Sequence, residues 1–127
     1  MIAALSTWHE QHRQAAPLLA TITSLPAHAL TESYSVLTRL PGGRALPACT
    51  AAALLAQRFN EPSLRLDDDA CAAFLATLSA SSIRGGATYD GLIGLEASTN
   101  GHRLLTLDRR AAPTYRLLGV QFDVIGE

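Results

Sequence analysis

The spacing of apolar residues in this 127-residue chain alternates between a helical period and a strand period, and this alternation constrains the fold. The clearest strand is residues 103–107 (RLLTL), and residues 120–125 (VQFDVI) alternate as an edge strand does. Strands separated by helices pair in parallel through right-handed crossovers. We therefore expect an α/β fold, a three-layer α/β/α sandwich with a mostly parallel sheet, formed by a single domain over residues 1–127.

The remaining elements are expected from periodicity and from start and stop signals. Helices are predicted over residues 3–22, 31–40, 47–59, 67–79, 88–100 and 109–118, and further strands over 25–30 (LPAHAL) and 63–66. Thr31 offers a hydroxyl N-cap, and Asp67 begins an acidic run that caps and charges a helix start. Asn100 and Gly101 form a C-terminal stop.

Composition excludes several classes of protein. With 48% hydrophobic residues the chain is too apolar to be disordered, and its uncharged stretches are too interrupted by proline to span a membrane. A net charge of −1 argues against a general nucleic-acid coat protein. The first residues lack the pattern of a signal peptide, so we expect a cytoplasmic location. Cys49 and Cys71 are interpreted as buried thiols.

Three acidic residues stand where parallel sheets gather their ligands, beyond the carboxyl ends of strands. Glu32 follows the LPAHAL strand in the first turn of a helix, and Asp108 directly follows RLLTL. Asp90 lies in the first turn of the helix that leads into that strand. The three carboxylates should therefore meet at one rim of the sheet.

Clustered carboxylates repel one another, so a fold tolerates them mainly when a cation neutralises them. Oxygen ligands suit Mg²⁺ or Mn²⁺, and such an ion can activate water and stabilise charge on a phosphodiester. The residues thus indicate an acidic, metal-dependent phosphoryl-transfer site. Acids at helix starts also occur for dipole reasons alone, and that interpretation stays open for each of the three.

Three segments together resemble a known family. HALTESYSVLTRLP, TYDGLIG and RLLTLDRR are similar in order, spacing and flanking residues to the second, third and fourth acidic motifs of PIN-domain ribonucleases of the VapC toxin type. The resemblance runs from about residue 25 to the carboxyl terminus. It implies that Glu32, Asp90 and Asp108 are the catalytic metal ligands for Mg²⁺ or Mn²⁺, with Thr106 directed at the same rim.

The chain departs from the family pattern at its amino end. Such proteins begin with a central strand ending in Asp-Thr-Ser or Asp-Ala-Ser, whose Asp is the first acid, whereas Met1 to Leu5 resemble the helix start that comes after that motif. Glu10 is a poor substitute because it lies along a predicted polar helix face. We interpret the domain as incomplete at its amino end, through a start codon placed too late, with a truncated chain or a remnant as alternatives.

The resemblance also implies partners. These are an RNA substrate, a cognate VapB-like antitoxin and a second copy in a homodimer, with Trp8, Leu37 and Leu40 displayed for such contacts. Four arginines, Arg103, Arg109, Arg110 and Arg116, lie near the carboxyl end. Either they are solvated and form salt bridges, or Arg109 and Arg110 steer an RNA backbone toward the metal.

Two hypotheses from different classes follow. The first is a metal-dependent endoribonuclease toxin of a type II toxin-antitoxin system, in which a metal-activated water hydrolyses RNA. The alternative is a catalytically inactive PIN-like remnant that binds an antitoxin or another protein, motivated by the missing first acid. A flavodoxin-like or receiver module fits the layers but lacks the early acidic cluster and the lysine, since the chain contains no lysine.

Overall fold

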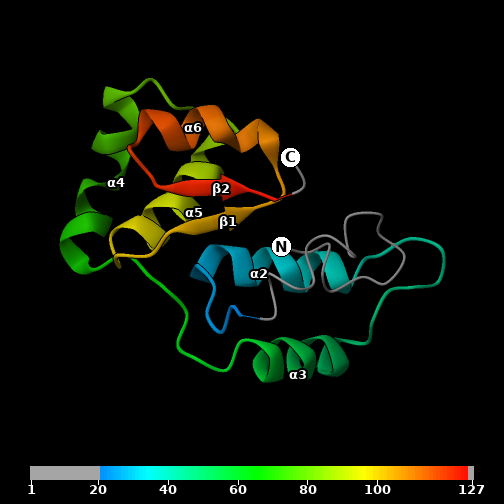
Figure 1. The fold of residues 1–127 in the computed structure, drawn as a ribbon. Coiled ribbons are helices and arrows are strands. Elements are labelled where there is room, and N and C mark those ends of the chain that lie inside the picture. The colour runs from blue at the N-terminus through cyan, green and yellow to red at the C-terminus, as the bar shows by residue number, and fades with distance from the viewer. Residues whose placement is uncertain (1–20, 126–127) are drawn as a thin grey trace.

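The computed structural model describes residues 21–125 and has the α/β class that the sequence predicts (Figure 1). Its elements in chain order are α2 (Ala27–Leu37), α3 (Ala48–Arg58), α4 (Asp68–Ala80), α5 (Ala87–Ser98), β1 (Leu104–Thr106), the 3₁₀ helix η2 (Arg109–Ala111), α6 (Ala112–Leu117) and β2 (Phe122–Val124). Within residues 21–125, no helix combines the length and the apolar character that crossing a bilayer requires.

Parallel pairing occurs in two places. β1 and β2 form a parallel ladder in which Leu104 faces Phe122 and Thr106 faces Val124, and α6 provides the crossover between them. Pro26 forms a separate parallel bridge with Leu64, closed by hydrogen bonds of 2.8 Å on both sides. The predicted parallel pairing is therefore confirmed, although the ladder is shorter than the predicted strands.

A cavity of about 230 Å³ separates these two pairings in the described part of the chain. Residues 21–26 line one wall, and residues 102–105 line the opposite wall. No described strand lies between them, so the sheet resolved over residues 21–125 is the two-stranded β1–β2 ladder. The predicted first helix, with Trp8 and Glu10, falls almost wholly outside the described residues.

The predicted strand over residues 25–30 is wrong beyond its first residues. Helix α2 already begins at Ala27, after Pro26, so His28 is helical. Thr31 is not an N-cap, because its hydroxyl donates within the helix to the Ala27 carbonyl at 3.2 Å. Glu32 is consequently the sixth residue of α2 and lies in its second turn, not its first.

The start of α2 is held by groups from elsewhere in the chain. Pro26 at the N-cap provides no side-chain hydrogen bond, and the first turn contains no acid. The backbone N–H of Ala27 donates to the Leu64 carbonyl at 2.8 Å, and that of His28 donates to Oε1 of Glu96 at 2.9 Å. Glu96 is buried on α5. A distant carboxylate and a distant carbonyl thus each satisfy one N–H group of the kind that a helix normally caps locally.

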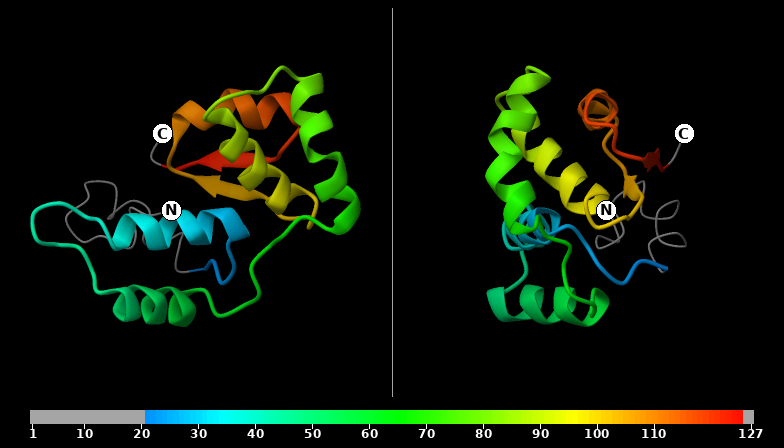
Figure 2. Two further views of the ribbon diagram at one scale, coloured as in Figure 1. Left: turned by 180° about the vertical axis from the view of Figure 1, so that it is seen from behind. Right: turned by 90° about the vertical axis from the view of Figure 1, so that its left-hand side faces the viewer.

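Two clusters of buried side chains hold the helices together. The first joins α5, α6 and the strands, which lie side by side in Figure 2, and centres on Ile93, Leu104 and Tyr115. The second joins α2 to α3 and includes Leu25 and Leu37. Leu37 is 1% exposed, so the expectation that it is displayed for partner contacts is wrong. The thiols were also misjudged, since Cys49 and Cys71 are both free and exposed.

Several local signals act as predicted. The Asp67 side chain accepts from the Ala70 N–H at 2.7 Å and caps α4. Gly101 follows α5 with a φ of +74°, a left-handed conformation that glycine adopts at little cost. These signals succeed because each depends on residues adjacent in sequence.

The role of Glu96 at the start of α2 can be tested by two substitutions. We expect Glu96→Ala to lower the free energy of unfolding by about 1–3 kcal/mol, because it leaves the His28 N–H without a partner. Glu96→Gln keeps an acceptor oxygen and should cost less. Urea unfolding measures both, with the exposed Glu61→Ala as a matched control. Equal effects of Ala and Gln at position 96 would contradict the assignment.

The same carboxylate predicts a pH dependence. Burial raises the pKa of Glu96 above its ordinary value of 4.5, and the hydrogen bond from the His28 N–H partly opposes this. A raised folded-state pKa contributes stability that is present below pH 4.5 and is lost as pH rises through the folded-state value. Wild type should therefore lose stability relative to Glu96→Gln across that window. Urea unfolding over a pH series measures the difference, and a constant difference would oppose the prediction.

Candidate functional site

Three different elements carry the predicted acids. Glu32 projects from α2, and Asp90 lies in the first turn of α5. Asp108 follows β1 and is the N-cap of η2, where its Oδ1 accepts from the Arg110 N–H at 2.9 Å. Asp90 and Asp108 are half-buried, whereas Glu32 is exposed.

The charges of these carboxylates act on one another. Partial burial raises the pKa of Asp90, and the negative charges of Asp108 and Glu32 raise it further. The positive charge of Arg110 acts in the opposite direction. Residues far apart in sequence therefore come close enough in space for the charges of Glu32 and Asp108 to act on Asp90. Asp90 and Asp108 occupy the helix start and strand end that the sequence predicts, whereas Glu32 reaches the rim from the second turn of α2.

The segment that carries Asp108 is held by Thr106. The Thr106 side chain is buried, and its Oγ1 accepts from the backbone N–H of Asp108 at 3.0 Å. The Arg110 Nε lies 3.3 Å from Asp108 Oδ1, although the Arg110 side chain is 93% exposed. Thr106 thus orients the acid from within, while Arg110 provides a solvated positive charge beside it.

Tyr115 of α6 lies beneath the acids and was missed by sequence reasoning. It is 3% exposed, and burial raises the pKa of its hydroxyl well above the ordinary value. The charge of Asp90 adds to that rise, and a side-chain hydrogen bond with Thr106 opposes it. Its ring fits against α5 because Gly94 has no side chain, since a Cβ there would lie 2.9 Å from Tyr115 Cδ1.

His28 is the second residue that sequence reasoning missed. Its Nε2 lies 3.0 Å from Oε1 of Glu32, one helical turn away on α2. Its ring stacks on Tyr89 of α5, with centroids 5.2 Å apart and planes inclined by 12°. The i, i+4 spacing of His28 and Glu32 signals such a pair in a helix. That signal was hidden because residues 25–30 were expected to form a strand.

The donor set of this rim suits a divalent cation by charge and chemistry. Glu32, Asp90 and Asp108 offer only carboxylate oxygens, the ligands that Mg²⁺ and Mn²⁺ prefer. The unfavourable ionisation of Asp90 is what a cation would relieve. Over residues 21–125, however, no three His, Cys, Asp or Glu side chains are already gathered as ligands. The three acids could hold a metal after side-chain adjustment.

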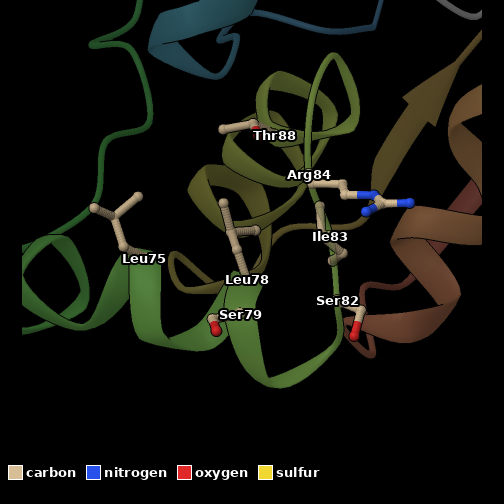
Figure 3. A pocket seen from close by; sticks show the side chains of 7 residues that line it. All are labelled: Leu75, Leu78, Ser79, Ser82, Ile83, Arg84 and Thr88. Atoms are coloured by element: carbon tan, nitrogen blue, oxygen red, sulfur yellow. The ribbon is translucent and has the colours of Figure 1, made fainter.

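Hollows elsewhere on the described surface do not contain these acids. One of about 660 Å³ lies between α4 and the loop into α5, and Figure 3 shows the side chains that line it. Its lining residues are Leu75, Leu78, Ser79, Ser82, Ile83, Arg84 and Thr88. An apolar groove of about 310 Å³ lies between α2 and α3, lined by Leu30, Thr31, Tyr34, Ala52, Leu55, Ala56 and Phe59.

The carboxyl-terminal arginines have different surroundings. Arg103 donates to Asp123 with its Nε 2.6 Å from Oδ2, which ties the residue before β1 to the middle of β2. Arg116 lies over the Phe122 ring at 5.6 Å. Arg109 and Arg110 belong to η2, directly after Asp108, so they are the two arginines next to the acidic rim in sequence.

Comparison with known proteins identifies relatives over nearly the whole chain. It is 38% identical over 125 residues to Ribonuclease VapC40 of Mycobacterium tuberculosis, a match that covers 98% of this chain and 93% of the relative. It is 42% identical over 122 residues to Ribonuclease VapC27 of the same species, covering 96% and 82%.

No protein-family model matches the chain. Identity at this level over almost the full length is nevertheless sufficient to show kinship, and it agrees with the three motifs and with the α/β fold. The chain belongs to the VapC family of PIN-domain ribonucleases.

Proposed function

We propose that the protein is a Mg²⁺- or Mn²⁺-dependent endoribonuclease, the toxin of a type II toxin-antitoxin pair. The observation that carries this proposal is that α2, α5 and the segment after β1 bring Glu32, Asp90 and Asp108 to one region, where burial and then the charges of Asp108 and Glu32 raise the pKa of Asp90. Kinship with two ribonucleases supports RNA as the substrate. The proposal thus takes RNA as the substrate from the relatives and the metal site from the three acids of this chain.

Each residue of the rim has a role in this proposal. Glu32, Asp90 and Asp108 hold the cation, which when bound supplies an activated water and neutralises charge on the phosphodiester. Thr106 keeps Asp108 oriented through its bond to the backbone N–H. Arg109 and Arg110 contact phosphate oxygens of the RNA, positioning the backbone without reading its sequence.

The proposed partners follow from the family and from the groove between α2 and α3. We expect a VapB-like antitoxin to place an apolar helix in this groove. The side chains that line the groove are largely aliphatic and aromatic, and Tyr34 among them is exposed. A homodimer and a cytoplasmic location are further parts of the proposal.

Removal of the central acid tests the reaction. We expect the protein to cleave RNA only when Mg²⁺ or Mn²⁺ is present, and Asp90→Asn to lower the rate about 100-fold or more, since losing a ligand should exceed the cost of losing an outer contact. Cleavage of a labelled RNA with and without EDTA measures this. Asp69→Asn, at an exposed acid of α4, is the matched control and should keep wild-type activity.

Two results would count against the enzyme. Full activity of Asp90→Asn would show that Asp90 is not a metal ligand of the active site. Absence of metal-dependent cleavage in wild type, together with retained antitoxin binding, would favour the inactive binding module instead.

Stability without metal provides an independent prediction. Because burial and two like charges disfavour the ionised Asp90, Asn at this position should raise the melting temperature in EDTA at neutral pH. The same variant should lose the rise in melting temperature that Mn²⁺ gives wild type. Thermal unfolding with and without Mn²⁺ measures both, with Asp69→Asn as control. A lower melting temperature of Asp90→Asn in EDTA would contradict the repulsion.

A further inference from the structure

We propose that His28 is a positioning residue that fixes the Glu32 carboxylate relative to Asp90 and thereby strengthens cation binding at the rim. The inference rests on the proposed function, because it takes Glu32 as a metal ligand. It assigns a role to a residue that is neither one of the three acids nor one of the arginines beside them.

His28 makes three contacts, and two of them join α2 to α5. Its backbone N–H donates to Glu96, and its ring stacks on Tyr89, both residues of α5. Its third contact, Nε2 to Glu32 Oε1 at 3.0 Å, remains within α2. Tyr89 directly precedes Asp90 in the chain. The imidazole of His28 therefore contacts Glu32 on α2 and Tyr89 on α5, the residue directly before Asp90.

The chemistry of the pair defines the direction of its hydrogen bond. A carboxylate oxygen only accepts, so Nε2 carries the hydrogen and donates it to Oε1. Among residues 21–125, Oε2 of Glu32 has no hydrogen-bond partner and remains available to a cation. A carboxylate held through one oxygen and open at the other is arranged as a ligand supported by an outer contact.

Fold stability alone does not explain this ring. The side chains of His28 and Glu32 are 24% and 47% exposed, and exposed ion pairs contribute little to stability. The hydrogen bond that caps α2 comes from the backbone of His28, so it survives replacement of the side chain. An aromatic replacement that keeps the stack on Tyr89 therefore removes only the hydrogen bond that orients Glu32.

Cation binding by the full chain tests the inference. We would measure Mn²⁺ affinity by titration calorimetry, with the metal alone and no RNA. We expect His28→Phe, which keeps an aromatic face toward Tyr89 but has no donor, to lower the affinity about 10-fold or more. His28→Gln, which restores an N–H donor, should recover most of the loss. His102→Gln, at an exposed histidine in a turn, is the control and should bind as wild type does.

Repeating the substitution in a second variant tests whether His28 acts by positioning Glu32 or through a general effect on the structure. In Glu32→Gln, adding His28→Phe should cause little further loss of Mn²⁺ affinity, because the ring acts through Glu32. An additional loss as large as in wild type would overturn the inference. His28→Ala repeats the test if the Phe variant does not fold, as judged by circular dichroism, since alanine is well tolerated in a helix.

The outcomes distinguish this inference from the function on which it rests. If wild type binds Mn²⁺, Glu32→Gln binds it weakly and His28→Phe binds it normally, the positioning role is wrong and the metal site stands. If wild type does not bind Mn²⁺, the proposed metal site is wrong and the role of His28 is wrong with it.

Discussion

No nearby side chain caps the first N–H groups of helix α2. The arrangement of the acidic rim depends on the distant groups that accept these N–H groups instead. Glu96 on α5 accepts the His28 N–H, so the start of one helix is held by the last turn of another. These helices carry Glu32 and Asp90. A hydrogen bond made by a buried carboxylate, whose ionisation burial itself disfavours, therefore helps to join the helices that carry two of the acids, together with the stack of His28 on Tyr89.

The rim shows a conflict between folding and binding. Burial and the charges of Asp108 and Glu32 disfavour the ionised form of Asp90, and the exposed Arg110 opposes this effect. Binding of the proposed cation would relieve this unfavourable charge. The outer contacts of the rim, Thr106 to the Asp108 backbone and His28 to Glu32, hold the acids in place despite that repulsion.

Sequence reasoning succeeded where the decisive contacts are local. The Asp67 cap, the stop at Gly101 and the strand before Asp108 all depend on neighbouring residues. It failed for residues 25–30, because a six-residue apolar run does not distinguish a strand from a buried helix start. The deciding partner there is Glu96, 68 residues away. The same error concealed His28. Asp90 and Asp108 do lie at a helix start and after a strand, as the sequence predicts, whereas Glu32 lies in the second turn of α2.

Gly94 shows how far the site extends into the core. Its missing side chain admits the Tyr115 ring, which contacts Thr106, and Thr106 in turn holds the backbone of Asp108. A larger residue at position 94 would displace this chain of contacts while leaving every acid in the sequence. The presence of the acidic residues alone therefore does not show that a related gene encodes an active nuclease. A substitution inside α5 can inactivate the protein without changing its acidic motifs.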